Sequence, residues 1–197
     1  MNFDQTLSKT VCGETVRYGI LRGNENILFL KTGAGGSIRG YGDKYLQMAY
    51  RAREKFGSTV ICASNPDVPH GSMDEQIIRQ VVSDGGFPAF TLSFVGISDG
   101  AYQILTLAGR FPETVRLLGI NPSFVTIPGL QEKLLALPHV EKIFVYGTKD
   151  DAYDRVVPAL NAMQCERFRT VIVEGADHRF TGMTEQLISL IDLLEAR

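Results

Sequence analysis

One short segment of the chain, Gly96-Ile97-Ser98-Asp99-Gly100, has the spacing typical of an exposed serine nucleophile. It follows an apolar run that ends at Val95 and precedes a helical pattern that begins near Ala101. The two glycines remove side chains that would clash in a sharp turn, and such a turn lifts the serine hydroxyl above the carboxyl edge of a sheet. The segment therefore predicts a nucleophile elbow with Ser98 as nucleophile. The alternative is a tight turn whose serine merely caps the helix.

A serine hydroxyl is a weak nucleophile until a base removes its proton, so a histidine is required, and the chain contains three. His139 directly precedes a predicted strand, which places it at the amino edge of the sheet, away from Ser98. His70 precedes the serine, whereas the acid and the histidine follow the serine in chains with this elbow. His178 lies between the last predicted strand and the last predicted helix, at the carboxyl edge, and we predict that it is the base.

A third group must orient the imidazole and stabilise its protonated form, which calls for a carboxylate at the end of another strand. The segment from Phe144 to Asp151 is a predicted strand followed by two aspartates. We expect Asp150, rather than Asp151, to be this acid. The alternative is that both are solvated turn residues ahead of a helix, where acidic side chains favour the helix dipole.

Acyl transfer also needs hydrogen-bond donors that stabilise the developing oxyanion. One expected donor is the backbone N–H of Asp99, and the other is the N–H of Ala34 in the glycine-rich loop 31–36. This loop lacks the Gly-Lys-Ser/Thr ending of a phosphate-binding loop. It also carries Ile38 where a dinucleotide fingerprint needs glycine. Both nucleotide-binding interpretations fail on a required residue.

The elements that must position these residues alternate between strands and helices, which predicts an α/β fold with a mostly parallel sheet covered by helices on both faces. Short apolar runs predict strands over 26–30, 59–63, 91–95, 116–120, 142–146 and 170–173. Helical patterns cover 41–56, 73–82, 101–111, 130–137, 153–163 and 184–194. The first 22 residues are expected to add one or two antiparallel edge strands. Ser72 and Glu75 have the spacing of a capping box.

The composition is that of an ordinary globular chain, with 44% hydrophobic residues, 21% charged residues and a net charge of -2. It gives no electrostatic reason to expect nucleic acid or an anionic membrane as a partner. The three cysteines (Cys12, Cys62, Cys165) predict neither a disulfide framework nor a metal site, and they favour a cytoplasmic protein. The sequence shows no leader or membrane span, and we expect a single domain over 1–197 with no cofactor.

Taken together, these motifs resemble the α/β-hydrolase superfamily from about Ile27 to the C-terminus. The loop at 32–36, the elbow at 96–100, the Gly-x-x-Asp at 147–150 and the histidine turn at 175–178 carry the resemblance. Their order, Ser98, Asp150 and His178, is that of the superfamily. The elbow segment looks especially like small esterases, thioesterases and peptidase-like hydrolases. One departure is Thr32-Gly33, where members often carry His-Gly, and it leaves the second oxyanion donor less defined.

The resemblance implies a serine hydrolase that cleaves carboxylic esters or thioesters through an acyl-enzyme. Larger relatives insert a helical cap where this chain has only about 20 residues between two strands, so we expect an open site suited to short or carrier-bound acyl groups. Candidate substrate-binding residues are Thr32, Arg39 and His70, and Lys44 and Arg179 are further candidates at the mouth. The alternative for the last four is that each is a solvated surface group. Two alternatives stay open: an idle hydrolase fold that binds a ligand or partner, and the same triad acting on an amide or carbon-carbon bond. The oligomeric state is open as well.

Overall fold

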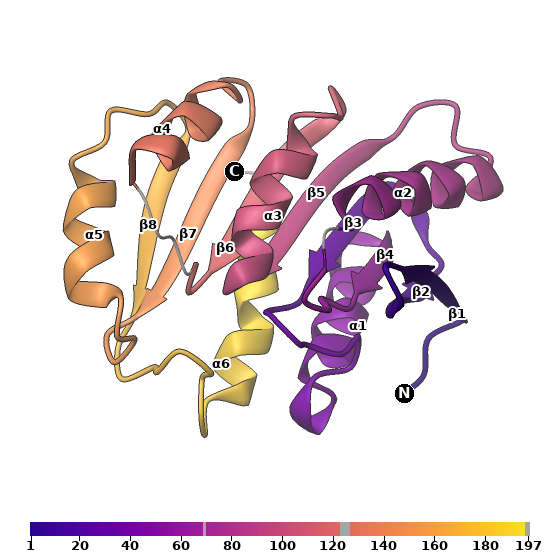
Figure 1. Ribbon diagram of the computed structural model, residues 1–197, viewed down its shortest axis with the longest axis horizontal. Coiled ribbons are helices and arrows are strands. Elements are labelled where there is room, and N and C mark those ends of the chain that lie inside the picture. The colour runs from indigo at the N-terminus through magenta and orange to yellow at the C-terminus, as the bar shows by residue number, and fades with distance from the viewer. Residues whose placement is uncertain (69, 123–126, 196–197) are drawn as a thin grey trace.

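A sheet of eight strands forms the centre of the computed structural model, which describes residues 1–68, 70–122 and 127–195 (Figure 1). The strands are β1 (Gln5–Val11), β2 (Glu14–Leu21), β3 (Asn24–Lys31), β4 (Ser58–Ala63), β5 (Thr91–Ile97), β6 (Thr114–Ile120), β7 (Glu141–Gly147) and β8 (Phe168–Val173). Each of the six strands predicted from short apolar runs is present and is longer than expected by one to three residues. The N-terminal stretch supplies two antiparallel strands, β1 and β2.

The strand order is β1-β2-β4-β3-β5-β6-β7-β8, and pairing is parallel from β4 through β8. The chain passes from β3 to β4 on one side and then returns past β3 to β5 on the other. Connections that leave neighbouring parallel strands in opposite directions open a crevice at their carboxyl ends. Lys31 at the end of β3 pairs with Gly96 near the end of β5, so the glycine-rich loop and the serine turn start side by side.

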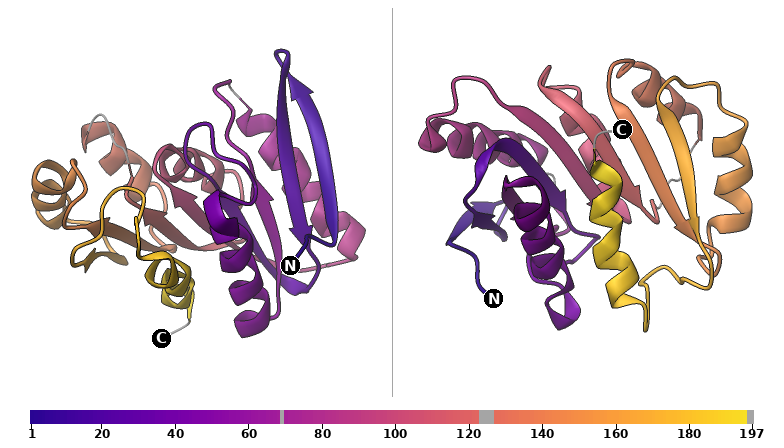
Figure 2. Two further views of the ribbon diagram at one scale, coloured as in Figure 1. Left: turned by 90° about the horizontal axis from the view of Figure 1, so that it is seen from below. Right: turned by 180° about the vertical axis from the view of Figure 1, so that it is seen from behind.

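Six α-helices among the described residues cover the two faces of the sheet (Figure 2). They are α1 (Lys44–Phe56), α2 (Gly71–Gly85), α3 (Asp99–Ala108), α4 (Ile127–Leu135), α5 (Tyr153–Asn161) and α6 (Thr184–Ser189). Short 3₁₀ turns precede α1 (η1, Tyr41–Asp43) and follow α6 (η2, Leu190–Leu194). Helices α2, α3, α4 and α5 lie on one face, and α1 and α6 lie on the other. This is the mostly parallel, two-sided arrangement that the sequence predicts.

Each face of the sheet has its own apolar core, because strand side chains alternate between the faces. On the α2–α5 face, Phe94 packs against Phe29 and Phe111, with ring centroids 5.9 and 6.4 Å away. On the opposite face, its neighbour Val95 belongs to the cluster that α1 and α6 cover. Full burial of each such side chain contributes roughly 1.5–3 kcal/mol, which fixes the sheet and therefore the positions of the loops at its edge.

The start of α2 differs from the sequence prediction. The helix begins at Gly71, with His70 at its N-cap position, and no side chain caps it. Ser72 therefore lies inside the first turn, where its hydroxyl cannot accept from the N–H groups that a capping box satisfies. Glu75 instead forms ion pairs with Arg79 and Arg110, at 2.9 and 3.0 Å. The predicted capping box is wrong.

The connection between β6 and β7 contains one helix, α4, within the part that the structure describes. The expectation of an open site without a cap concerns this connection, and residues 123–126 of it lie outside the described residues. The helices within the described ranges are too short or too polar to cross a bilayer.

Candidate active site

Ser98 occupies the turn between β5 and α3 in a backbone conformation that side chains rarely adopt, with φ 54° and ψ -120°. The turn is this tight because its glycines have no side chains. A Cβ at Gly96 would lie 2.5 Å from Ala101 Cα, and a Cβ at Gly100 would lie 2.5 Å from Thr32 O. The Ser98 hydroxyl makes no cap hydrogen bond with α3, although the residue stands at the N-cap position. The side chain is therefore not used to cap the helix.

The structure brings Ser98, His178 and Asp150 into one hydrogen-bonded line at the carboxyl edge of the sheet. His178 Nε2 lies 2.9 Å from Ser98 Oγ, and His178 Nδ1 lies 2.6 Å from Asp150 Oδ2. Because a carboxylate only accepts, Nδ1 carries the proton and donates to Asp150, which leaves the Nε2 lone pair facing the serine hydroxyl. The side chain of Asp150 is 2% exposed, whereas that of His178 is 44% exposed.

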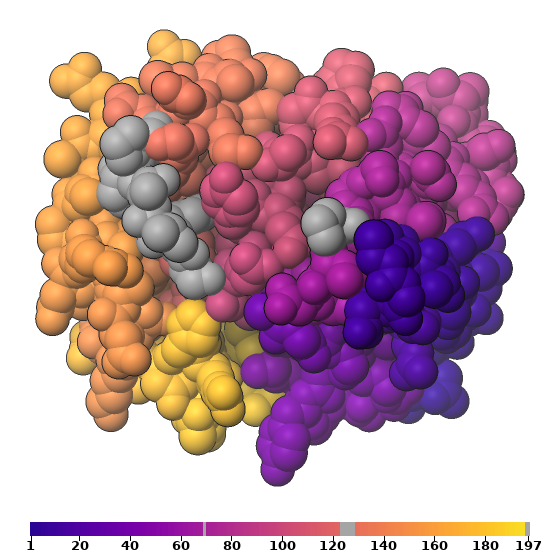
Figure 3. All heavy atoms as spheres, in the orientation of Figure 1, coloured from indigo at the N-terminus to yellow at the C-terminus, as the bar shows by residue number. Residues whose placement is uncertain are grey.

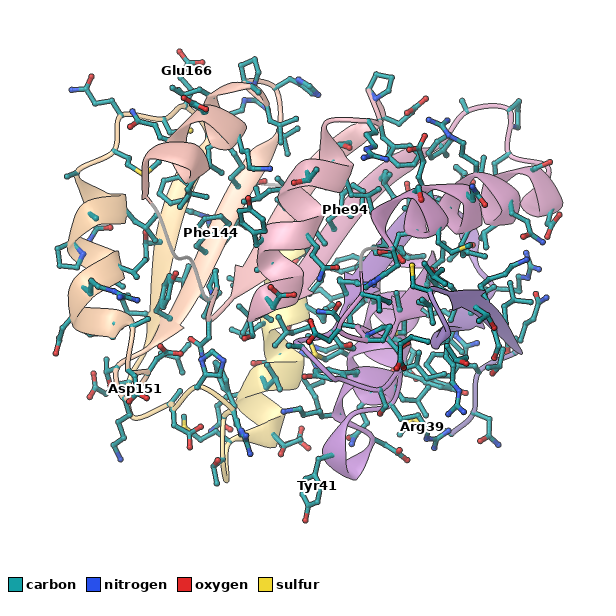
Figure 4. All side chains as sticks on the ribbon, in the orientation of Figure 1. Arg39, Tyr41, Phe94, Phe144, Asp151 and Glu166 are labelled. Atoms are coloured by element: carbon teal, nitrogen blue, oxygen red, sulfur yellow. The ribbon has the colours of Figure 1, made fainter. Side chains whose placement is uncertain are left out.

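The two adjacent aspartates have different surroundings. Asp150 is buried, and its second oxygen accepts from the N–H of Ala152 at 2.8 Å, so both carboxylate oxygens are fixed. Asp151 is exposed, at the edge of the molecule in Figure 4. The structure therefore places Asp150, the acid that the Gly-x-x-Asp spacing favours, beside His178 and leaves Asp151 in solvent. His139 lies ahead of β7, at the other edge of the sheet, as the sequence predicts.

The loop that carries His178 is fixed by its own neighbours. Asp177 accepts hydrogen bonds from the N–H groups of Arg179 and Thr181, at 3.0 and 2.8 Å, and hydrogen bonds from Thr181 hold the pKa of Asp177 below its usual range. Gly147, at the end of β7, lies so close to this loop that a Cβ there would be 2.2 Å from Ala176 O. The acid loop and the histidine loop are thus packed directly against each other.

A residue that the sequence analysis missed, Asn121, connects these loops. It is buried at the carboxyl end of β6, with φ 43°. Its Nδ2 donates to the carbonyls of Asp177 and His178, each at 3.1 Å, and its Oδ1 accepts from the N–H of Gly147 at 2.9 Å. One side-chain amide therefore joins the loop of the base to the strand of the acid. The available signal was an asparagine, which tolerates positive φ, directly after a predicted strand.

The two expected oxyanion donors face the same region. Asp99 is the first residue of α3, and the first N–H groups of a helix have no partner inside it. The Ala34 N–H makes no hydrogen bond with the described residues, although its loop is held by bonds from Gly35 N to Asn65 O and from Gly36 N to Gly33 O. A Cβ on Gly33 would lie 3.3 Å from Ser98 Cβ, so the loop lies against the serine. Their role as donors stays a prediction.

Two of the candidate substrate-binding residues are placed elsewhere. Thr32 is fully buried, with its hydroxyl within hydrogen-bonding distance of the carbonyls of Gly36 and Ala63, so it holds the loop. The guanidinium of Arg39 forms two 2.8 Å hydrogen bonds with Asp43 and lies on the α1 side of the molecule, away from the acid loop (Figure 4). Both side chains are thus engaged by other parts of the chain, Thr32 by Ala63 and Arg39 by Asn2 as well as Asp43, and their role in substrate binding stays a prediction.

His70 is also buried, within a network of titratable groups that the sequence analysis missed. The ammonium of Lys31 contacts His70 Nε2 and donates to Asp74 Oδ2 and Ser64 O, both at 2.9 Å. Because an ammonium only donates, Nε2 must accept, and Nδ1 therefore carries the proton and donates to Val68 O. This neutral tautomer has no free nitrogen, so His70 cannot be the base. His70 does line a pocket between α2 and α3, and its role in substrate binding stays a prediction.

The same network reaches β2, where the Tyr18 hydroxyl donates to Asp74 Oδ1 at 2.8 Å. Burial lowers the pKa of Lys31, an effect that Asp74 opposes, and burial together with Asp74 raises the pKa of Tyr18 far above its usual range. Lys31 and Tyr18 thus contact the two different oxygens of the Asp74 carboxylate. Lys31 directly precedes the glycine-rich loop, and the network therefore anchors the start of that loop.

The described residues contain no cluster of histidine, cysteine or carboxylate side chains that could hold a metal ion. Lys44 extends to the histidine loop, where its ammonium donates to Arg179 O at 3.3 Å. Lys44 and Arg179 are therefore the candidates for the mouth of the site that lie beside His178.

Comparison with protein-family models and with curated proteins finds no match to this sequence. Solved structures do match, over nearly the whole chain. An α/β serine hydrolase homologue from Coxiella burnetii superposes with a TM-score of 0.74 and 16% identity, covering 99% of each chain. Est1E from Butyrivibrio proteoclasticus superposes with a TM-score of 0.71 and 11% identity, covering 95% of this chain and 96% of its own. An α/β serine hydrolase without lid from Xanthomonas campestris superposes with a TM-score of 0.64 and 18% identity, covering 96% of this chain and 92% of its own. At these identities the likeness establishes the fold alone.

Proposed function

We propose, from the α/β-hydrolase fold of this chain and the line of Ser98, His178 and Asp150 at its carboxyl edge, that the protein is a serine hydrolase acting on carboxylic esters or thioesters. The observation that carries the proposal is the pair of short contacts on His178, 2.9 Å to Ser98 Oγ and 2.6 Å to Asp150 Oδ2. Three residues from separate loops meet with the donor and acceptor order that nucleophilic catalysis needs.

In the first half of the reaction, His178 Nε2 removes the proton from Ser98 Oγ as the oxygen attacks the substrate carbonyl. The carbonyl oxygen becomes an oxyanion, which the N–H groups of Asp99 and Ala34 stabilise. The imidazolium of His178 is stabilised by the Asp150 carboxylate. It then gives its proton to the leaving alcohol or thiol, and an acyl group stays on the serine.

In the second half, His178 activates a water molecule that attacks the acyl-enzyme. The exposed side of the imidazole is the side from which water arrives, since 44% of this side chain is accessible. The tetrahedral intermediate uses the same two N–H donors, and its collapse returns the proton to Ser98 Oγ. The carboxylic acid then leaves, and the resting hydrogen bonds form again.

Among the compared structures, Est1E has been solved with ferulic acid bound, and one neighbour is an esterase domain from a Rhodothermus marinus protein. The descriptions of these two neighbours, a ferulic acid complex and an esterase domain, support a carboxylic ester as the substrate proposed for this chain. The three cysteines are free thiols in the structure, which supports a reducing compartment such as the cytoplasm. The single sheet supports one domain over 1–197.

Replacement of the nucleophile tests the proposal. We expect Ser98→Ala to abolish turnover of p-nitrophenyl acetate and labelling by a fluorophosphonate probe, while circular dichroism stays unchanged. Serine hydrolases that lack one triad member retain only about 10³–10⁴-fold catalysis over water. Ser72→Ala is the matched control and keeps full labelling. Labelling that persists in Ser98→Ala, or a wild-type protein that the probe does not label, would contradict the proposal and favour an idle fold. A panel of esters, thioesters and aminoacyl amides then identifies the bond.

A further inference from the structure

A pocket of about 350 Å³ lies beside the serine turn, between α2 and α3. Its wall on the α3 side is one stripe of the helix and the turn that follows it, from Asp99 through Tyr102, Gln103 and Thr106 to Arg110. Figure 3 shows this face of the molecule, with α3 between α2 and α4. The volume falls within the range of sites for small molecules. None of the steps proposed above uses this pocket beyond its first residue, Asp99.

The position of the pocket determines which part of a substrate it would hold. His178, which must protonate the leaving group, comes from the β7–β8 side of Ser98. The pocket lies on the other side, where the loop after β4 leads into α2. With its leaving group on the His178 side, an acyl chain on Ser98 would extend the opposite way, past Asp99 and toward the pocket.

The two ends of the pocket differ in charge. At the serine end, the carboxylate of Asp99 accepts from Asn65 Nδ2 at 3.0 Å and Gln103 Nε2 at 2.7 Å, which are neutral donors. Asp99 makes no ion pair in the described part of the chain. Lys31 is close enough for Asp99 to act on its pKa, but its ammonium is paired with Asp74. A negative charge close to the scissile bond would be repelled there.

The far end is positive. One nitrogen of Arg110 donates to Glu75 at 3.0 Å, but Glu75 is shared with Arg79, so its single charge is divided between two guanidinium groups. Lys133 adds a further cation at the rim, where it donates to Thr106 Oγ1 and lies 4.9 Å from the centre of the Tyr102 ring. The lining also includes the apolar side chains of Val68 and Leu107.

We propose that this pocket is the acyl site of the enzyme and that it selects acyl chains ending in an anion, as in the half-esters of long dicarboxylic acids. The chain extends along the apolar middle, and its terminal carboxylate binds the guanidinium of Arg110, which can form paired hydrogen bonds with a carboxylate. Along α3 and the turn after it, the rise from Ser98 to Arg110 is roughly 18 Å, which the Arg110 side chain and an acyl chain of eight to ten carbons span together, whereas a short diacid places its charge near Asp99. The proposal rests on the serine hydrolase function.

Matched substrates test it. The mono-p-nitrophenyl esters of suberic and sebacic acid are compared with the octanoate and decanoate, which have the same chain lengths and no terminal charge. We expect kcat/KM to favour the acid-ended ester by about tenfold, the value of one hydrogen bond to a charged group. The half-ester of succinic acid should be poorer than butyrate, because its charge meets Asp99. If the wild type has nearly equal kcat/KM values for the long acid-ended esters and the uncharged esters of the same length, the proposal is overturned.

Two variants locate the recognition. Arg110→Gln should reduce the preference for the acid-ended ester by about tenfold, and Arg110→Glu should reverse it. The control of equal charge change is Arg22→Gln, on an exposed side chain that bonds Gln5 far from the pocket, and it should keep the wild-type ratio. If Arg110→Gln retains that ratio, the assignment of the anion site is wrong.

Binding separates this proposal from the proposed function. Monomethyl suberate and methyl octanoate are titrated by calorimetry into Ser98→Ala, which cannot turn them over. Tighter binding of monomethyl suberate, lost in Ser98→Ala/Arg110→Gln, supports the pocket even if the wild type hydrolyses none of the esters tested. Equal binding of the two esters overturns the pocket assignment even if the wild type is an active esterase.

Discussion

At the scale of single residues, the site depends on a few side chains that have only one way to satisfy their hydrogen bonds. His178 is held in one tautomer by Asp150, and Asp150 is held by a second donor, the N–H of Ala152. His70 is held in one tautomer by Lys31, which leaves it without a free nitrogen. The same residue type therefore serves as the proposed base at one position and as a buried structural partner at the other.

The two adjacent aspartates allow a direct comparison at this scale. We expect Asp150→Asn to lower kcat by about 10⁴-fold, because an amide can offer an N–H to His178 and so stabilise the wrong tautomer. Asp151→Asn, which changes an exposed side chain, should keep kcat within about twofold. Steady-state kinetics with p-nitrophenyl acetate measures both. The opposite result would assign the acid to Asp151, and two silent variants would mean that the acid lies elsewhere.

Asn121 is a positioning residue, since its amide contacts the loops of the base and the acid but not the reacting atoms. We expect Asn121→Gly, which suits the positive φ but removes all three hydrogen bonds, to lower kcat by roughly 10²-fold with little change in KM, because small displacements of reacting groups have effects of that size. Asn161→Gly, at the end of α5, is the comparison. If Asn121→Gly loses only thermal stability while kcat is retained, the amide has no positioning role.

At the scale of elements, the buried ion pair of Lys31 and Asp74 joins β3 to α2. Its other contacts reach β2 through Tyr18 and the loop after β4 through Ser64. A fully paired network of this kind stabilises little by itself, but removal of one partner leaves an uncompensated charge in the core. The elements on this side of the site therefore depend on both partners being present.

We expect Lys31→Met to lower the free energy of unfolding by about 3–5 kcal/mol, because Asp74 would remain buried with only the Tyr18 hydroxyl as donor. The double variant Lys31→Met/Asp74→Leu should recover most of that loss. Urea denaturation followed by circular dichroism measures both, with the exposed Lys9→Met as a control that changes stability by less than about 0.5 kcal/mol. A single variant as stable as the wild type would show that the ion pair does not matter for the fold.

The elements themselves were largely predictable from the sequence, because the strands are short apolar runs between turn residues and the helices have amphipathic spacing. The strand order was not, and it is what brings Tyr18, Lys31 and Asp74 together from three separate segments. Local spacing also predicted the wrong start for α2. Ser72 and Glu75 have the residue types and spacing of a capping box, but the helix begins at Gly71, so Ser72 is not at the N-cap position. The role of Asn121 could not be predicted either, because it depends on which loops lie next to the end of β6 in the folded protein.

At the scale of the whole molecule, the connection between β6 and β7 has room for little more than α4, so we expect no lid that responds to an interface. The rate of hydrolysis of short acyl esters should rise smoothly with substrate concentration, with no jump when the substrate aggregates. The measurement is a rate profile across the critical micelle concentration of a lipid ester. A sharp rise there would mean that the segment 123–138, or a second subunit, covers the serine.

The serine and its histidine are 80 residues apart in the chain, and the loops that carry them meet only when β5, β6, β7 and β8 have paired. Contacts between such distant segments form late, because the loop between them must close first. The proposed hydrolysis would therefore require completion of the carboxyl half of the sheet. Its appearance during refolding would measure the rate of that last step.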